Sequence, residues 1–417
     1  MIMEEKSNHN SYRALVTQRQ YCKLIVANLV GRFGDSLDAI AYSWLVYQVT
    51  GNAAMMAVLL TFNTLPGILL QPFAGVWADQ LPKRKMMLWC DIGRAACIIG
   101  TVLLYFGGFL FYGVLILLTL LQSSLEAFRM PAGNAFVPFI LEKEHYNAGL
   151  ALNASFSRVV ELVGTAVAGG LVAILGCPVV LLIDGGCFLL SAFVISLIRY
   201  QEAPVMASKG VREYGRQLLE GVQAFKKSKM LRAIVLLGGL MNFINVPFSA
   251  FQTPYVAQVL QRDAGLLSAM GVAFTGGMGL GSFFTPKLKE RYKGKYLFLT
   301  AGFGGGMVFY IGLFGIPHLA VWAQIPLLLA LVLLFGFSVG LQSVLFSACF
   351  MSCVEQRQMG RVSALTNALL TCIVPAGSLL SAAAAEWMPL PVVFLLCGLL
   401  LGIVYLLLLP KPVYDQL

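Results

Sequence analysis

Twelve apolar stretches, each long enough to cross a lipid bilayer, follow one another along almost the whole chain. A helix that spans the hydrocarbon core needs about 20 mostly apolar residues, and only helices and closed barrels satisfy their own backbone groups in lipid. We therefore predict an all-α integral membrane protein with twelve transmembrane helices. The predicted spans cover roughly residues 22–49, 53–78, 86–107, 109–130, 148–175, 177–199, 231–260, 264–286, 296–316, 319–346, 363–385 and 389–410.

The composition excludes a soluble protein. Of the 417 residues, 59% are hydrophobic and 12% are charged, whereas the charged fraction of soluble domains is about 25%. The segment before the first span has no apolar core and no small-residue cleavage site, so we expect no cleavable signal peptide. The nine cysteines are scattered through apolar runs without a C-x-x-C pair, so neither a metal site nor a cofactor is predicted.

The distribution of basic residues predicts the orientation in the membrane. An even number of spans places both termini on one side, and most of the 29 Lys and Arg residues lie in segments on that side. Because cytoplasmic loops are rich in Lys and Arg, we predict a multi-pass protein of the cell membrane with both termini in the cytoplasm. Its net charge is therefore explained by topology, and no nucleic-acid partner is predicted.

The longest connection, residues 201–229, divides the chain into two six-span bundles, 1–200 and 230–417. Its segment 214–227 alternates apolar and basic faces at helical spacing. This pattern predicts either an amphipathic helix on the inner membrane surface or a plain linker between the two bundles.

The two halves of the sequence also resemble each other. Gly75, which precedes a basic loop, has a counterpart in Gly281, and Asn153 matches Asn367. These pairs are about 210 residues apart, which is typical of two parallel six-helix repeats. The second copy has Thr285 near the place where the first has an acid.

A charged turn between the second and third spans carries a family motif. Gly75, Asp79, Lys83 and Arg84 follow the pattern G-x-x-x-D-x-x-x-R/K-R/K. This stretch resembles the signature between helices 2 and 3 of the major facilitator superfamily. Further stretches at 34–51, 128–132 and 360–363 resemble the macrolide-efflux and enterobactin-exporter branch of that superfamily, and the resemblance covers essentially the full length.

The resemblance implies a secondary-active transporter with its substrate site between the two repeats. It also implies a conformational latch made by Gly75, Asp79, Lys83 and Arg84. In this latch Asp79 either pairs with a cation such as Arg129 or faces the positive N-terminus of the eleventh helix. Two features of many drug antiporters are missing, namely a mid-membrane arginine in helix 4 and a proline in helix 5.

Ionisable residues inside the membrane are the main candidates for function, because burying them is unfavourable. They are Arg32, Asp35, Asp38, Asp91, Arg94, Glu126, Arg158, Glu161 and Asp184, all in the first half of the chain. The i,i+3 spacing predicts ion pairs within single helices, at Arg32/Asp35, Asp91/Arg94 and Arg158/Glu161. Glu126 lies near the inner surface, so the other five acids face three arginines, and about two acids are predicted to bind protons more readily than to stay charged.

Asp35 is the first candidate for a proton carrier, because the resemblance implies that helix 1 lines the cavity. Glu161 is the second, and a network of Arg32, Asp35, Arg158 and Glu161 is predicted from their similar depth. Asp38 is included in this proton-coupling group. Asp91, Arg94 and Asp184 lie on helices that the resemblance places at the periphery, so a structural role is predicted for them.

Polar and aromatic residues on helices 1, 2 and 7 are the candidates for substrate binding. They are Asn28, Tyr42, Asn63, Asn242, Asn245, Phe248, Gln252 and Tyr255. Pro247 and Pro254 are expected to break helix 7 near such a site. The alternative is that these side chains make hydrogen bonds between helices.

These observations predict a proton-coupled exporter that works as a monomer in the lipid bilayer and expels an amphipathic small molecule, such as a macrolide-like drug or a siderophore. The expected cavity, apolar with few charges, favours such a compound over an inorganic anion. An uptake symporter of the same fold remains an alternative. The chain has no G-x-x-x-x-G-K-[ST] motif for an ATP-driven pump, and no H-E-x-x-H or G-x-S-x-G motif for a membrane enzyme.

Overall fold

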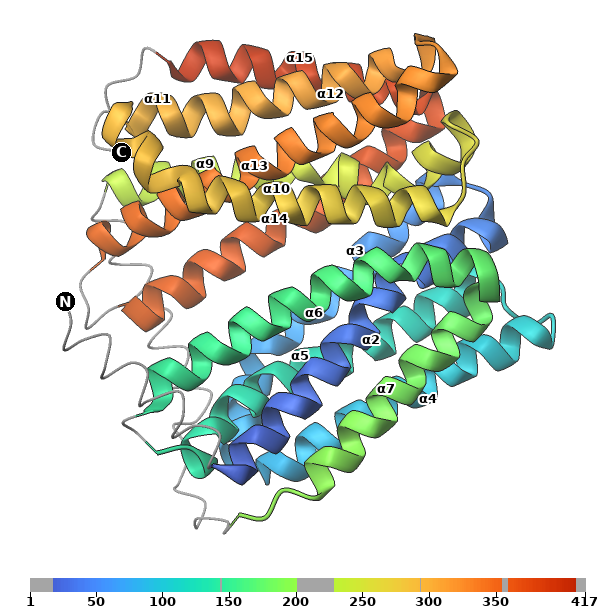
Figure 1. Cartoon of the computed structure of the whole chain (residues 1–417), viewed down its shortest axis with the longest axis vertical. Coiled ribbons are helices and arrows are strands. Elements are labelled where there is room, and N and C mark those ends of the chain that lie inside the picture. The colour runs from blue at the N-terminus through green and yellow to red at the C-terminus, as the bar shows by residue number, and fades with distance from the viewer. Residues whose placement is uncertain (1–17, 143–144, 201–228, 293, 355–358, 410–417) are drawn as a thin grey trace. The chain divides into compact units, whose positions relative to one another are not determined.

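The computed structural model describes residues 18–142, 145–200, 229–292, 294–354 and 359–409 (Figure 1). Within these residues the regular structure is entirely helical. The segment 214–227, for which an amphipathic helix was one prediction, lies outside the described residues.

Twelve spans run through the described part of the chain, as predicted. Before the central connection they are α2 (Arg19–Thr50), α3 (Ala53–Gln80), α4 (Lys83–Phe106), α5 (Tyr112–Ile140), α6 (Tyr146–Leu175) and α7 (Cys177–Ser196). After it they are α9 (Lys229–Pro254), α10 (Ala264–Arg291), α11 (Gly294–Leu299) with α12 (Gly305–Gly315), α13 (Val321–Cys353), α14 (Met359–Trp387) and α15 (Leu390–Leu408).

Among the described residues, eleven segments are long and apolar enough to cross a membrane by length and composition. The other predicted span, α2, is less apolar because it carries Arg32, Asp35 and Asp38 along its length. An all-helical, multi-span fold is thus confirmed.

The helices pack into two compact units. Unit 1 comprises the described residues of Met1–Val49 and Leu65–Arg212, and unit 2 comprises those of Thr50–Thr64 and Glu213–Leu417. The beginning of α3 therefore belongs with the C-terminal helices, and within unit 2 the Thr61 hydroxyl is hydrogen-bonded to that of Ser378 on α14 at 2.5 Å. The units differ from the two sequence halves in this one segment.

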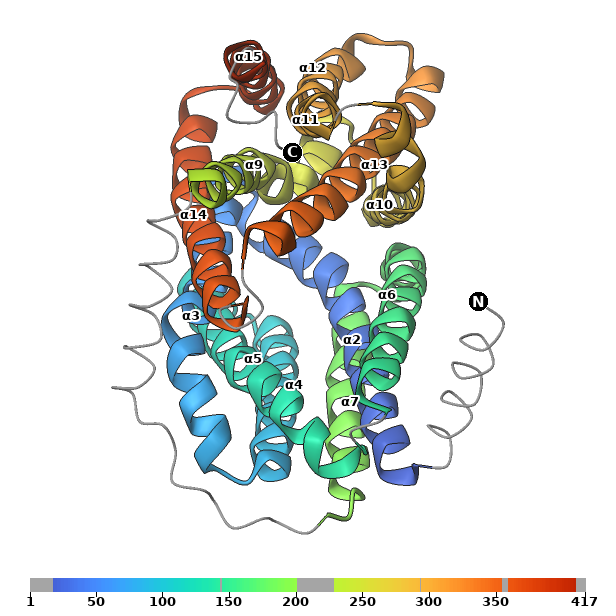
Figure 2. The ribbon, with the colours of Figure 1, turned by 90° about the vertical axis from the view of Figure 1, so that its left-hand side faces the viewer.

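In unit 1, α4 packs along both α5 and α7 (Figure 2). An apolar cluster at one end of the bundle joins Tyr21 and Leu24 of α2 to Met87 of α4, Phe136 of α5 and Ile195 of α7. Each of these side chains is at most 1% exposed. This cluster fixes the positions of four helices next to the polar residues described below.

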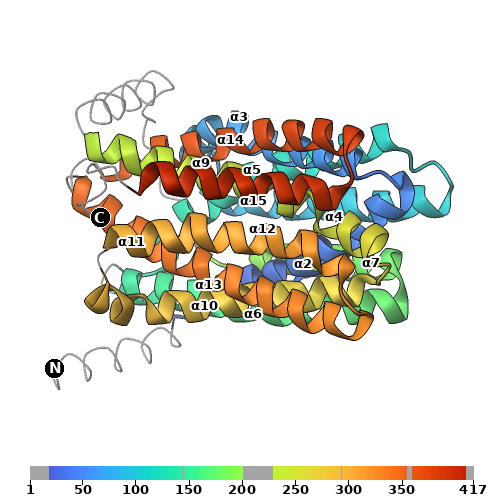
Figure 3. The same ribbon diagram turned by 90° about the horizontal axis from the view of Figure 1, so that it is seen from above.

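In unit 2, α10 lies beside α13, α12 beside α15, and α9 beside α14 (Figure 3). The contact between α10 and α13 is made through four glycines. A Cβ atom on Gly277 or Gly281 would overlap a backbone carbonyl of α13, and a Cβ on Gly336 or Gly340 would overlap a carbonyl of α10. The two backbones therefore touch directly, as in membrane helix pairs built on small residues spaced by four.

The predicted break of helix 7 is only partly found. Helix α9 continues through Pro247 and ends at Pro254, where a π-helical turn (Tyr255–Val259) carries the chain on. Neighbouring helices and local π geometry accommodate proline in membrane helices, so Pro247 does not interrupt this one.

Candidate functional site

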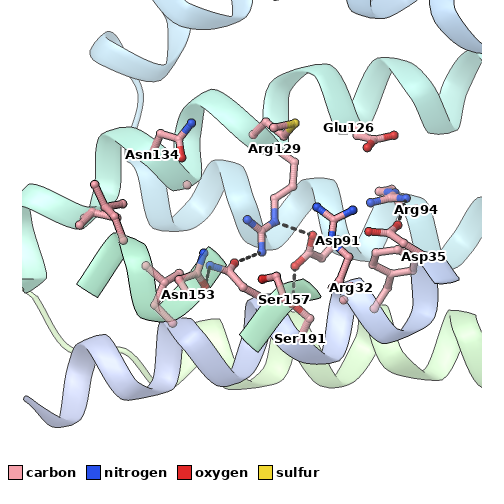
Figure 4. Close-up of a pocket in the computed structure, with 18 of the residues that line it drawn as sticks. Arg32, Asp35, Asp91, Arg94, Glu126, Arg129, Asn134, Asn153, Ser157 and Ser191 are labelled. Carbon is pink, nitrogen blue, oxygen red and sulfur yellow. Dashed lines mark hydrogen bonds and ion pairs between the residues drawn. The ribbon is translucent and has the colours of Figure 1, made fainter. Parts of the chain in front are cut away.

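A cavity of about 170 Å³ lies inside unit 1, between α2, α4, α5, α6 and α7 (Figure 4). Its lining is rich in charged and amide side chains. The polar residues around it include Asn28, Arg32, Asp35, Asp91, Arg94, Glu126, Arg129, Asn134, Asn153, Ser157 and Ser191. The ionisable residues of several helices thus converge on this cavity.

The first ion pair joins α2 to α4. The guanidinium group of Arg94 donates to the Asp35 carboxylate at 2.7 Å, and the face of the same guanidinium lies 4.0 Å from the ring centre of Phe188 on α7. The Arg94 side chain is 7% exposed and that of Asp35 is 26% exposed. Asp35 is thus the more accessible partner, and it lies on the cavity wall.

The second ion pair joins α4 to α5 and continues into a hydrogen-bonded chain. Arg129 donates to the Asp91 carboxylate at 3.0 Å and to the side-chain oxygen of Asn28 at 3.0 Å. The other oxygen of Asp91 accepts a 2.7 Å hydrogen bond from Ser191 on α7. Asn28 also donates to Asn153 of α6 at 3.4 Å, so the chain connects five helices of unit 1.

These pairs correct the predicted ion pairing. Only Arg158 pairs with the acid three residues away, at 3.0 Å from Glu161, and the two side chains are 65% and 31% exposed. Asp35 and Asp91 instead pair with arginines on neighbouring helices. Helical spacing identifies partners on one helix only, whereas a long arginine side chain also reaches across a helix contact.

The predicted network of Arg32, Asp35, Arg158 and Glu161 is accordingly absent from the described residues. Asp91 and Arg94, for which a peripheral structural role was predicted, line the cavity and make its ion pairs. The one sequence signal for this arrangement is the run of small residues on the facing helices, such as Gly31 and Ser191, which lets α2, α4 and α7 approach closely.

Two further charged residues of opposite sign face the cavity, Arg32 from α2 and Glu126 from α5 (Figure 4). Both are exposed, and neither makes an ion pair with another residue in the described ranges. They remain accessible to a bound molecule.

Two acids next to the Asp35–Arg94 pair have few partners. Asp38 accepts one long hydrogen bond from Gln122, at 3.5 Å, and its other oxygen is buried without a partner among the described residues. Asp184 on α7 is completely buried, and neither of its oxygens has a hydrogen-bond partner in the described part of the chain. Both acids interact electrostatically with Arg94.

The residues predicted to bind substrate are distributed over both units. In unit 1, Asn28 lines the cavity, while the Tyr42 hydroxyl lies 2.8 Å from that of Thr119. In unit 2, Asn63 is exposed and Asn245 and Gln252 are partly exposed, whereas Asn242 donates to the backbone oxygen of Leu370 at 3.2 Å.

The two aromatic candidates in unit 2 belong to its interior packing. Phe248 packs edge-on against Phe309 and Phe335, whose rings stack on each other at 4.1 Å. Tyr255 is 1% exposed and donates its hydroxyl proton to the backbone oxygen of Leu313 at 2.6 Å. Its position argues against the predicted substrate contact, because both the ring and the hydroxyl already have protein partners.

The predicted latch residues are partly described. Lys83 lies over the ring of Phe139 at 5.2 Å, and Arg84 donates to the backbone oxygen of Ile198 at 2.9 Å. Gly75 and Asp79 lie near the C-terminus of α3, where side chains are outside the described part. Arg129 donates hydrogen bonds to Asp91 and Asn28.

The hydrogen bond from Ser191 to Asp91 provides a test of the chain that links the helices. Ser191 is fully buried and Asp91 is 1% exposed, so Ser191→Ala is expected to lower the free energy of unfolding by about 1.5–3 kcal/mol, as for other bonds to charged groups. Thermal unfolding of the purified protein in detergent measures this. The control is Ser43→Ala, because Ser43 is partly exposed and donates its hydrogen bond to the backbone of Ala39 on its own helix. Equal melting temperatures for the two variants would contradict the assignment.

Comparison with known proteins identifies similar chains. The sequence profile of the Major Facilitator Superfamily matches residues 24–376. An uncharacterized MFS-type transporter of Bacillus subtilis, YvqJ, is 25% identical over 89% of this chain and 87% of its own length. Macrolide efflux protein A of Streptococcus pyogenes is 24% identical over 85% and 86%, and the multidrug efflux pump Tap of Mycolicibacterium fortuitum is 24% identical over 91% and 93%.

Solved structures with the same fold include two transporters. A bacterial homologue of the iron transporter ferroportin superposes with a TM-score of 0.71 at 15% identity, covering 94% of this chain and 99% of the other. The nucleoside transporter NupG superposes with a TM-score of 0.70 at 13% identity, with the same coverage. The resemblance inferred from the sequence motifs is confirmed.

Proposed function

We propose that this chain, which belongs to the Major Facilitator Superfamily of membrane transporters, expels an amphipathic small molecule in exchange for protons. Two of its relatives are named as efflux proteins, one for macrolides and one for several drugs. The observation that supports proton exchange most strongly is the surplus of acids around Arg94 in the interior of unit 1.

The surplus follows from the ion pairs. Arg94 is paired with Asp35, yet Asp38 and Asp184 also interact with it and have no other cation partner within the described residues. A single guanidinium compensates one carboxylate, and an uncompensated buried carboxylate is so unfavourable that it takes up a proton instead. The cluster therefore binds protons in its resting state.

Asp35 supplies the connection to the cavity. Asp35 is more exposed than Arg94, its ion-pair partner. It lies on the cavity wall, where water or a bound molecule reaches it. A proton passed from one surplus acid to Asp35 lets that acid, now a carboxylate, pair with Arg94. Asp35 then releases the proton to water in the cavity, and uptake of a proton by the surplus acid restores the pair between Arg94 and Asp35. Such a shift couples a proton to the arrangement of α2, α4 and α7, and alternating access in these transporters proceeds by rearrangement of helix bundles.

The unpaired charges of the cavity indicate which compounds fit. Arg32 and Glu126 offer one positive and one negative group beside apolar surface from residues such as Met130 and Val137. Burying a charged ligand is favourable only when it is paired. We therefore expect an amphipathic compound with one or two charged groups, and Glu126 favours a basic group.

The cellular setting is part of the same proposal. The transporter lies in the cell membrane with both termini in the cytoplasm and functions as a monomer. Asp79, with Gly75, Lys83 and Arg84, acts as a conformational latch. This role is supported by the family motif and by the position of Asp79 in the last turn of α3.

The test is transport in membrane vesicles of known orientation. A panel of drugs, including macrolides, and siderophores is first screened on a deletion strain and a complemented strain to identify a compound that the transporter expels. Inside-out vesicles are expected to accumulate this compound when a proton gradient, acidic inside, is imposed, and a protonophore is expected to abolish accumulation. Accumulation in right-side-out vesicles driven by inward proton movement would instead establish the alternative, an uptake symporter.

A further inference from the structure

From the burial of Asp184 on α7 we infer that this residue holds a proton in the described conformation and is the proton store of the transporter, next to the accessible Asp35. Its role in transport rests on the proposed proton coupling. The protonation of Asp184 does not rest on that proposal, and it can be measured without any substrate.

No group in the described residues compensates a negative charge on Asp184. Asp184 is 0% exposed, and both of its carboxylate oxygens lack a hydrogen-bond donor among the described residues. The charged groups that face it are Asp35 and Asp38 of α2 and Arg94 of α4, and the thiol of Cys187 lies on its own helix. Two of these groups are acids, and the single cation is paired with Asp35 at 2.7 Å.

Asp91, the other buried acid near the same contact, differs from Asp184 in its partners. Asp91 is 1% exposed, but its two oxygens are bonded to Arg129 and to Ser191 at 3.0 and 2.7 Å. Asp91 is thus stabilised as a carboxylate, whereas Asp184 has the surroundings of a neutral acid. A lone buried charge is unfavourable enough to make protonation the favoured state.

A close contact with α2 encloses Asp184. Oδ1 of Asp184 lies directly on the backbone of α2 at Gly34, where a Cβ atom would overlap it. Movement of α2 away from α7 at this point would give water access to the carboxyl. Release of the proton is therefore coupled to a movement between two helices of unit 1, one of which carries Asp35.

Infrared spectroscopy of the purified protein in lipid tests protonation directly. The spectrum of the wild type minus that of Asp184→Asn is expected to contain the C=O stretch of a protonated carboxylic acid near neutral pH. The control is Glu161→Gln, which removes an acid that is paired with Arg158 and 31% exposed, so that difference spectrum should lack this band. A missing band in the Asp184 spectrum would overturn the inference, whatever the transport assays give.

The melting temperatures of the purified variants provide a second test, which is informative even when a variant folds poorly. Asn is nearly isosteric with neutral Asp, so Asp184→Asn should keep the melting temperature close to that of the wild type. Asp91→Asn removes the partner of Arg129 and should lower it clearly, since breaking a buried pair is strongly destabilising. If Asp184→Asn is as unstable as Asp91→Asn or fails to fold, Asp184 is a charged structural residue and the inference is wrong.

The enclosing contact can be opened with a single methyl group. Gly34→Ala should separate α2 from α7 and admit water to Asp184. The infrared band of protonated Asp184 should then disappear at a lower pH than in the wild type. The matched control is Gly31→Ala, one turn away on α2, where the added carbon makes only an ordinary 3.9 Å contact with Phe188. Identical pH dependence of the band in the two variants would contradict the role of the Gly34 contact.

Transport assays then separate this inference from the proposed function. In Asp184→Asn, proton-driven accumulation should be lost while substrate exchange across vesicles without a gradient is retained. If the infrared band belongs to Asp184 but wild-type transport does not respond to the proton gradient, the proposed proton coupling is wrong, whereas the protonation of Asp184 is still supported. If wild-type transport is proton-driven and the variant still drives accumulation fully, Asp184 is not the proton store.

Discussion

Gly281→Val is expected to prevent the C-terminal unit from folding. Gly281 of α10 lies on the backbone of α13, where a Cβ would overlap the carbonyl of Phe337 and approach the amide nitrogen of Leu341 to 3.0 Å. These are backbone atoms of a helix, so no side-chain rotation relieves the overlap. Overpacking costs typically about 1–3 kcal/mol and more where the backbone itself must shift, and the close Cα–H···O contacts between the helices are lost as well.

The yield of monodisperse protein and its melting temperature in detergent measure this effect. Gly279→Val is a matched control on the same helix, because Gly279 is exposed and no atom lies within 4 Å of the added carbon. The Gly281 variant is expected to aggregate or to melt far below the wild type, whereas the Gly279 variant should behave like the wild type. Similar yields and melting temperatures for both would mean that α10 and α13 do not pack through these glycines.

The helix pair also illustrates what the sequence alone predicts. The spans were predictable because runs of about 20 apolar residues have only one stable form in lipid. Glycine spacing alone does not distinguish Gly281, at the contact, from Gly279, which faces outward. The partner glycines on α13, Gly336 and Gly340, became apparent only from the fold.

The candidate site was less predictable. The sequence identified Asp35 and a surplus of buried acids, but it paired each arginine with the nearest acid on its own helix. The observed partners, Arg94 for Asp35 and Arg129 for Asp91, lie 59 and 38 residues away in the chain. Such pairs depend on which helix faces meet, and helical periodicity carries no information about that. Asp184 was assigned a structural role because the family resemblance places its helix at the periphery.

Asp35→Asn is expected to abolish proton-driven transport, which is the largest functional effect in this protein. The substitution removes the accessible partner of Arg94, so Arg94 is left facing Asp38 and Asp184. One of these acids then becomes its permanent carboxylate partner. The fold survives because the guanidinium remains paired, but protonation no longer changes the pairing, and proton movement is uncoupled from the helices.

Transport assays in vesicles should show a loss of proton-driven accumulation in the Asp35 variant. Accumulation of the substrate against its gradient should fall to the level of empty vesicles in Asp35→Asn, while exchange of labelled for unlabelled substrate continues. Glu161→Gln serves as the control, because Glu161 pairs with Arg158 away from the cavity and both side chains are partly exposed. A comparable loss in the Glu161 variant would show that the effect is not specific to Asp35.

Proton release on substrate binding tests the central claim most directly. Purified transporter in weakly buffered detergent solution is mixed with a compound identified in the susceptibility panel, and a pH-sensitive dye reports the protons released. Wild-type protein is predicted to release protons in proportion to the substrate bound, whereas Asp35→Asn should bind the compound and release none. Release from the Asn variant equal to that from the wild type, or binding to the wild type without any release, would contradict proton exchange through the acids around Arg94.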